Sequence, residues 1–169
     1  MDLPVTSEPS DRFLAAVGAL TLNWAVIETG LDFACAIVFH EFEGRKIEPE
    51  IPRSLGRKIS FLKRGLKHSR LASIRAYGLD LLQTIADRKN ERHEIVHGAV
   101  TGNVKEDAVQ MMRVQYTPEM HHSTTHVVTV DEVGEASARA LALANPAIML
   151  AIGLHNIARP EKPIHYAAS

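Results

Sequence analysis

Hydrophobic residues recur at steps of three and four along residues 10–40. They are Phe13, Val17, Leu20, Trp24, Ile27, Leu31, Ala34 and Val38. This period predicts a long α-helix with one buried face, and Ser10 or Asp11 is suited to cap its start. The next stretch, EFEGRKIEPEIP, ends that helix with its Gly and Pro residues. A second, shorter helix is predicted from Ser54 over SLGRKISFLKRGLKH, whose apolar residues fall on one side.

A third helix is predicted from about residue 70 to residue 97, with Gly98 as a left-handed residue that ends it. The texture of the chain then changes, because Val, Thr and Tyr become frequent and turn-forming residues separate short runs. This pattern predicts antiparallel strands at roughly 99–104, 108–116 and 124–130.

A last helix is predicted to begin at Asp131 or Glu132 and to run to about Ile157. Its Ala-rich pattern suits close packing against another helix. Pro146 lies inside this run, and we expect it to kink or break the helix.

These elements predict a mainly α fold, a helical bundle of four main helices with a small antiparallel β-insertion over 99–130 before the last helix. A chain of 169 residues is long enough for one domain with its own core. We expect residues 1–169 to form a single domain with an ordered core at 10–158. The tails, 1–9 and 159–169, are expected to be flexible.

Composition argues for a cytoplasmic protein without a membrane span. The longest apolar stretches are interrupted by Asn23, Glu28 and Asp32, and the N-terminal sequence MDLPVTSEPSD lacks the basic start and apolar core of a signal peptide. Cys35 is alone, which rules out an intrachain disulfide and suits a reducing compartment. A lone cysteine of this kind is usually part of the core.

Charge is distributed unevenly, although the net charge is only −1. Residues 1–50 hold nine acidic and three basic residues, whereas residues 51–79 hold eight basic residues and no acid. Such a segment attracts polyanions such as RNA. The residues predicted to bind RNA are Arg57, Lys58, Lys63, Arg64 and Lys67. A second interpretation stays open, in which these residues form a solvated helix surface that faces the acidic N-terminal segment of this chain or of a second subunit.

Arg92 lies in the middle of the apolar stripe of the third helix when residues are placed at about 100° intervals. An unpaired buried charge costs several kcal/mol, roughly, so this arginine must be paired or reach a surface shared with a partner. Glu28 lies on the apolar side of the first helix and is predicted to pair with Arg92 or Arg88.

Two histidines accompany this arginine in the stretch RHEIVHG. His93 and His97 are four residues apart and therefore neighbours on the helix, and Glu94 lies beside them. A histidine near neutral pKa moves protons at physiological pH, and an arginine binds phosphate through two parallel hydrogen bonds. Arg92 and His97 are about 140° apart, so they meet one ligand only at the helix end or across a two-fold dimer. The alternative is an ordinary polar helix terminus.

The motif Arg92-His93-Glu94-Ile95-Val96-His97 resembles the signature of the HEPN superfamily, an arginine, a polar residue, a short gap and a histidine near a helix end. The glycine after His97 and the stretch NWAVIE in the first helix add to the resemblance, which covers the first and third helices. Arg88 and His93 have a similar spacing, but Lys89 does not suit the polar position. The β-insertion departs from the minimal four-helix form.

The resemblance implies a homodimer with the motif at its interface, acting as a metal-independent ribonuclease of the toxin, defence or RNA-processing type. It also implies an alternative, because some members are non-catalytic binding or regulatory modules. The resemblance implies that Arg92 contacts the scissile phosphate, that His97 is the general acid or base and that His93 assists. The supporting residues are Glu28, Arg88, Asn90 and Glu94. An antitoxin or another protein is an expected partner.

We expect no cofactor and no metal. The sequence has no phosphate-binding glycine loop, no serine nucleophile elbow and no Cys–Zn spacing. His122 and His126 share one face of a strand, but suitable further ligands are not close in sequence. A solvated loop and strand edge is the favoured interpretation of this histidine-rich run.

Overall fold

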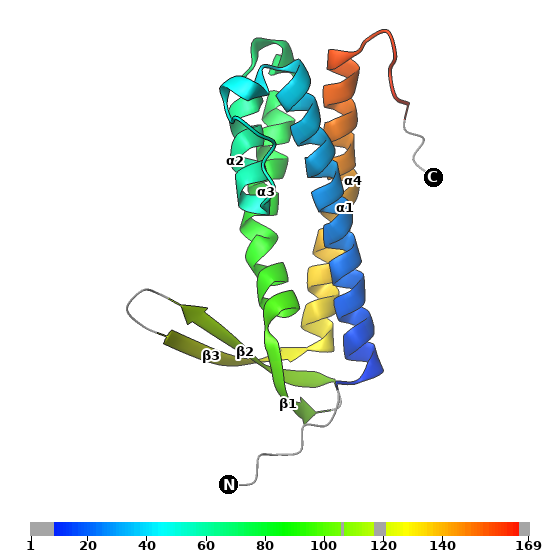
Figure 1. Cartoon of the computed structure of the whole chain (residues 1–169). Coiled ribbons are helices and arrows are strands. Elements are labelled where there is room, and N and C mark those ends of the chain that lie inside the picture. The colour runs from blue at the N-terminus through cyan, green and yellow to red at the C-terminus, as the bar shows by residue number, and fades with distance from the viewer. Residues whose placement is uncertain (1–8, 106, 117–120, 166–169) are drawn as a thin grey trace. The chain divides into compact units, whose positions relative to one another are not determined.

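The computed structural model describes residues 9–105, 107–116 and 121–165 (Figure 1). The described elements are α1 (Asp11–Glu41), α2 (Leu55–Gly65), α3 (Ala72–His97), β1 (Ala99–Lys105), β2 (Ala108–Tyr116), β3 (His121–Thr129) and α4 (Val130–Ala158). Two short 3-10 turns, Gly44–Lys46 and Ser69–Leu71, join the first three helices. The predicted fold class is confirmed, with four α-helices and a small antiparallel sheet before the last helix.

The chain divides into two compact units. The sheet unit consists of Met1–Trp24 and Arg88–Leu141, and the helical unit consists of Ala25–Asp87 and Ala142–Ser169. The sheet unit therefore contains the start of α1, the end of α3, the whole sheet and the start of α4. The prediction of a single domain stays a prediction.

In the helical unit, α1 and α4 approach closely at glycine and alanine. A Cβ added to Gly30 would lie 2.7 Å from the carbonyl carbon of Ala147, so only a glycine allows this approach. Tyr77 of α3 donates a hydrogen bond from its hydroxyl to the carbonyl oxygen of Pro146 at 3.1 Å. Of the two outcomes predicted at Pro146, a kink or a break, the break is wrong, because α4 continues through that residue.

The second helix ends earlier than its sequence pattern predicts. It stops at Gly65, three residues before the end of the predicted stretch. Arg75 of α3 explains the end, because its guanidinium donates to the carbonyl oxygens of Leu66 at 2.9 Å and Lys67 at 3.1 Å. A side chain from another helix thus satisfies carbonyls that the next turn would otherwise use.

In the sheet unit, the strands have the order β1-β2-β3 with antiparallel pairing. Val109 pairs with Val128, and both side chains are buried together with Met111. A capping box begins α4. The amide of Glu132 donates a hydrogen bond to the Thr129 hydroxyl oxygen, and the amide of Thr129 donates to the Glu132 carboxylate at 2.8 Å. The helix start is therefore determined by Thr129, slightly before the predicted residues.

Gly98 corrects another expectation. Its φ is not positive, so it does not end α3 as a left-handed residue. Its amide instead donates to the Glu94 carbonyl at 3.2 Å, and the chain continues directly into β1. A Cβ at this position would lie 2.7 Å from the Glu94 carbonyl oxygen and 2.7 Å from Cε of Met111. Glycine is required here because a Cβ would collide with the Glu94 carbonyl oxygen, a backbone atom of the last helical turn, whereas Cε of Met111 is the flexible end of a side chain.

The C-terminal segment was expected to be flexible from residue 159. Within the described part, Asn156 accepts from the amide of Ile164 at 2.8 Å and donates to its carbonyl at 3.1 Å. Arg159 pairs with Glu41 at 2.6 Å. Arg159 and Ile164 thus contact helix ends of the same unit, while residues 166–169 and the N-terminal residues 1–8 lie outside the described residues.

Two helices are long and apolar enough to cross a membrane by length and composition, namely α1 and α4. The core helix of a soluble protein passes the same test, and 44% and 33% of their most apolar windows are buried in the protein. The expectation that the chain has no membrane span therefore stays a prediction.

Candidate functional site

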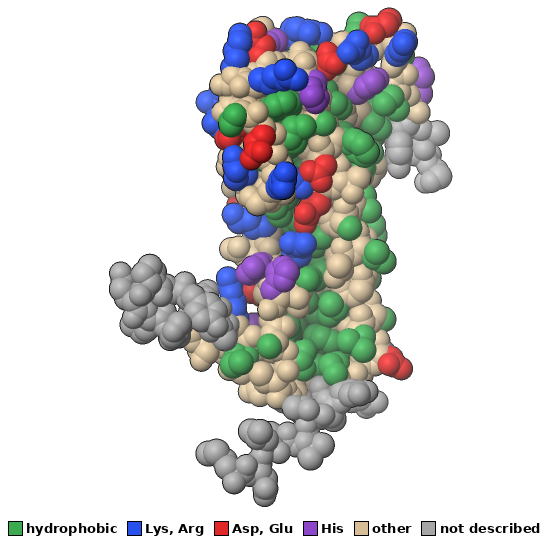
Figure 2. Space-filling view, viewed as in Figure 1, with side chains coloured by type: hydrophobic (Ala, Val, Ile, Leu, Met, Phe, Trp, Pro, Cys, Tyr) green, Lys and Arg blue, Asp and Glu red, His purple; other side chains and the backbone are tan. Residues whose placement is uncertain are grey.

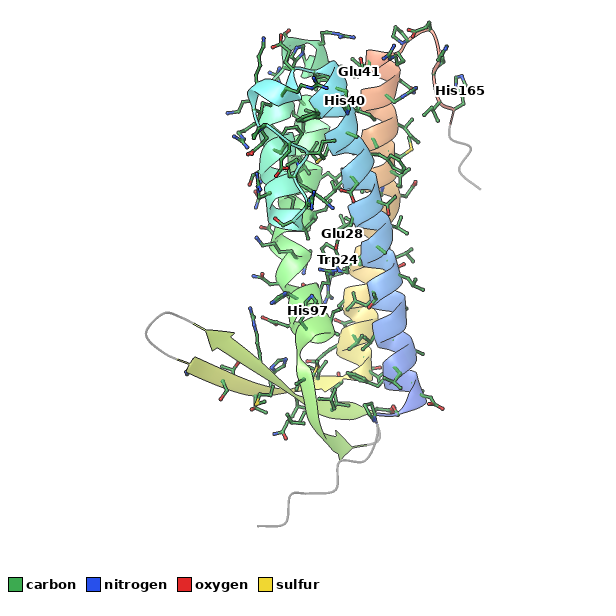
Figure 3. All side chains as sticks on the ribbon, in the orientation of Figure 1. Trp24, Glu28, His40, Glu41, His97 and His165 are labelled. Carbon is green, nitrogen blue, oxygen red and sulfur yellow. The ribbon has the colours of Figure 1, made fainter. Side chains whose placement is uncertain are left out.

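The last turns of α3 place His93 and His97 side by side on the surface of the sheet unit. Their ring centroids are 4.9 Å apart, and the ring planes meet at 54°. Both side chains are exposed. Figure 3 labels His97 at the C-terminal end of α3, and Figure 2 shows exposed histidine side chains there with basic side chains beside them. The pair that the sequence spacing predicts is therefore formed and accessible.

The surroundings of His93 favour its neutral form. Desolvation lowers the pKa of His93 below its usual 6.5, and the positive charges near it, from His97, Arg113 and Arg92, lower the pKa further. The Glu94 carboxylate acts in the opposite direction, with the smallest effect. A neutral imidazole at physiological pH has a free ring nitrogen that is able to accept a proton.

Arg113 of β2 joins this group, which sequence reasoning did not predict. Its Nη1 donates to Oε1 of Glu94 at 3.3 Å, and the guanidinium is partly buried. Glu94 is itself one of the predicted supporting residues, and the structure gives it a partner from the sheet. No local signal in the sequence marks Arg113, because its position depends on the register of β2 and on the packing of the sheet against α3.

A network of ion pairs holds the end of α3 against α4 inside the sheet unit. Glu91 accepts from Arg88 at 2.7 Å and from Arg139 at 3.2 Å. Arg139 also donates to Glu135 at 3.3 Å, one turn earlier on α4. The predicted supporting residue Arg88 therefore pairs with its own helix, and the bridge to α4 comes from Glu91 and Arg139, which the sequence analysis did not single out.

A cavity of about 260 Å³ opens beside this network. It is lined by Glu91, Glu94, Ile95, His126, Val127, Val128, Glu132, Ala136 and Arg139. Hydrogen bonds from Thr129 lower the pKa of Glu132, and the nearby His126 lowers it further. Within the part of the chain that the structure describes, no three His, Cys, Asp or Glu side chains are placed to hold a metal ion.

Three further residues of the predicted site are Arg92, Asn90 and Glu28. Arg92 is partly buried on α3, and Asn90 is exposed two residues earlier. Glu28 is partly buried on α1, but it belongs to the helical unit, so its predicted pairing with Arg92 or Arg88 stays a prediction.

The basic segment differs most from its predicted role. Lys58 is only 5% exposed, and its ammonium lies 2.7 Å from Oδ1 of Asp32. A buried ammonium cannot contact RNA at the surface, so the predicted role of Lys58 in RNA binding is wrong. Arg57 and Arg64 both pair with Glu48, whose pKa their hydrogen bonds lower.

Two lysines of the set remain on the surface of the helical unit. Lys63 donates to the side-chain oxygen of Gln83 at 2.7 Å, and Lys67 is exposed. The acidic partners Asp32 and Glu48 both come from the N-terminal segment. These contacts favour the second interpretation of the charge pattern, a basic helix surface that pairs with the acidic segment of the same chain.

Comparison with protein families, with curated proteins and with solved structures finds no match to this chain.

Proposed function

We propose that the chain is a HEPN-like, metal-independent RNA endonuclease that acts in the cytoplasm as a homodimer. The observation that carries the proposal is the pair of exposed imidazoles in the last turn of α3, 4.9 Å apart, one of which has a lowered pKa. Two neighbouring imidazoles, of which His93 is held in its neutral form, suit general acid–base chemistry on a phosphodiester. Toxin, defence and RNA-processing roles all fit this chemistry.

The proposed reaction is an internal transesterification. An imidazole takes the proton of the ribose 2′-hydroxyl, and that oxygen forms a bond to phosphorus while the bond to the 5′-oxygen breaks. A protonated imidazole gives its proton to the leaving 5′-oxygen, so the products are a cyclic phosphate and a 5′-hydroxyl. In this scheme His97 is the acid or base, His93 assists, and Arg92 stabilises charge on the phosphate.

The geometry of α3 is the reason for proposing a homodimer. Arg92 and His97 are about 140° apart around α3, so one ligand meets both side chains most readily where two copies of the helix face each other. An antitoxin or another protein is a further proposed partner for this surface.

A second candidate function is a non-catalytic interaction or regulatory protein. The contacts of the basic segment leave less of its charge for RNA, because Lys58, Arg57 and Arg64 pair with acids of the same unit. Exposed apolar side chains on α1, such as Leu14 at 54% and Leu22 at 69%, also suit a protein-binding surface in the sheet unit.

The deciding experiment incubates the purified protein with mixed-sequence RNA in EDTA, beside an Arg92→Ala/His97→Ala double variant that circular dichroism shows to be folded. Cleavage by the wild type alone, with cyclic-phosphate ends, supports the endonuclease. Equal cleavage by both proteins would assign the activity to another site or to a contaminant. Absence of cleavage by either would favour the interaction protein.

A further inference from the structure

Helix geometry places His97 on a different side of α3 from Arg92. At about 100° per residue, His93 lies about 40° and Glu94 about 60° from His97, whereas Arg92 lies about 140° away. His93, Glu94 and His97 therefore share one side of the last helical turn. A ligand of a single copy that contacts both imidazoles approaches from this side.

The sheet places a different arginine on that side. Nη1 of Arg113 lies 3.3 Å from Oε1 of Glu94, between the two histidine positions along the helix. Arg113 also contributes more than Arg92 to lowering the pKa of His93. The contact with Glu94 places the Arg113 guanidinium beside the helical turn that carries both histidines.

The packing of β2 explains why Arg113 is held there. Met111 and Arg113 are two residues apart in β2, so their side chains emerge from the same face of the strand about 7 Å apart. Met111 is buried and lies against Gly98 at the end of α3. Met111 thus lies at the end of α3, and Arg113, on the same face of β2, lies beside Glu94 one turn earlier in the helix.

We infer that Arg113, His93 and His97 form a phosphate-binding site within a single copy of the chain. Two of its groups come from the helical motif and the third comes from the β-insertion. Arg113 supplies a planar fork of donors that matches two phosphate oxygens, and the imidazoles supply N–H donors. Where the inference concerns RNA, it rests on the proposed function, and Arg113 is then the arginine that meets the phosphate from the same side as the histidines.

Glu94 competes with phosphate at this site. In the structure its carboxylate is paired with the Arg113 guanidinium, so an incoming phosphate shares or takes over a cation that Glu94 already holds. Removal of the Glu94 charge therefore has an effect opposite to removal of the Arg113 charge. A residue pair that only stabilises the fold would not change phosphate affinity in opposite directions.

The test is an NMR titration of the full-length isotope-labelled protein with inorganic phosphate, followed at the His93 and His97 ring resonances. Arg113→Gln exchanges a charged hydrogen-bond donor for a neutral one, so we expect this variant to bind phosphate about tenfold more weakly or worse. Removal of a like charge about 4 Å from the bound anion predicts that Glu94→Gln tightens binding about fivefold. Arg12→Gln is the matched control, because Arg12 pairs with Asp107 at 3.0 Å in the same unit and is predicted to leave binding unchanged.

Each outcome decides the inference. Weaker binding by Arg113→Gln together with tighter binding by Glu94→Gln supports the site, and Arg113→Lys should then keep part of the affinity. If Arg113→Gln does not fold, tighter binding by Glu94→Gln supports the site and unchanged affinity overturns it. Wild-type protein that shows no phosphate-dependent histidine shift also overturns it.

The RNA assay separates this inference from the proposed function. Phosphate binding that depends on Arg113, without RNA cleavage by the wild type, retains the site and refutes the endonuclease. Cleavage that needs Arg92 and His97 but is unchanged in Arg113→Gln, with unchanged phosphate affinity, retains the endonuclease and refutes the role of Arg113.

Discussion

Two glycines of α1 have opposite surroundings, which predicts opposite effects of the same substitution. A Cβ added to Gly30 would lie 2.7 Å from the carbonyl carbon of Ala147, 2.9 Å from its oxygen and 2.9 Å from the amide nitrogen of Ile148. All three atoms belong to the α4 backbone, which a rotamer change cannot move away. A Cβ added to Gly18 meets nothing within 4 Å.

The size of the difference follows from two terms. Gly to Ala in a helix interior favours folding by about 0.8–1 kcal/mol, and this term is the same at both positions of α1. Overpacking at Gly30 costs about 1–3 kcal/mol, and the upper part of that range is expected because the blocking atoms are backbone. Gly18→Ala should therefore raise the free energy of unfolding by up to about 1 kcal/mol, while Gly30→Ala should lower it relative to Gly18→Ala by about 1–3 kcal/mol.

Urea unfolding followed by far-ultraviolet circular dichroism measures both variants beside the wild type. The two variants differ only in position on the same helix, so Gly18→Ala is the control for helix propensity. Equal stabilisation by both substitutions would refute the close approach of α1 and α4 at Gly30. Destabilisation by both would refute the reasoning from propensity at an open position.

Two further predictions concern ionisable groups. Burial, with a smaller effect of Asp32, raises the pKa of Cys35 to about 12. Iodoacetamide should therefore alkylate this thiol far more slowly in the folded protein than in urea, as measured by mass spectrometry. Equal rates of alkylation would contradict the burial of Cys35. Folding lowers the pKa of His93, so the unfolded chain takes up the proton first as the pH falls below about 6.5. The free energy of unfolding should therefore fall as the pH drops from this value to the lower pKa of His93 in the folded state. Thermal melts at several pH values should show a smaller loss of stability for His93→Gln than for the wild type. An unchanged pH dependence in this variant would contradict the lowered pKa.

Much of the fold was predictable because its helices and strands are visible in local patterns. The apolar period of α1 and the change to Val- and Thr-rich runs after His97 both depend on neighbouring residues alone. Boundaries were predicted less well where a distant side chain decides them, as Arg75 does at the end of α2. Gly98 is a special position as predicted, but the reason is the close approach of the Glu94 carbonyl oxygen rather than a left-handed conformation.

The candidate site was predictable to the extent that it lies on one helix. The spacing of His93 and His97 determines that the rings are neighbours, because residues four apart share a helix face. The partner of Glu94 was not predictable, since Arg113 lies nineteen positions away and reaches it only through strand register and sheet packing. The basic segment shows the same limit, because its composition does not reveal that Lys58 is buried against Asp32.

The sequence by itself thus determined the helices, the strands and the histidine pair, which all arise from the fixed rise and rotation of a regular backbone. Only the tertiary structure decided which charges are available to a ligand. Pairing depends on distances between segments that are remote in the chain, and burial changes the cost of leaving a charge unpaired. Arg113 beside the histidines and Lys58 inside the helical unit are two results of that same physical cause.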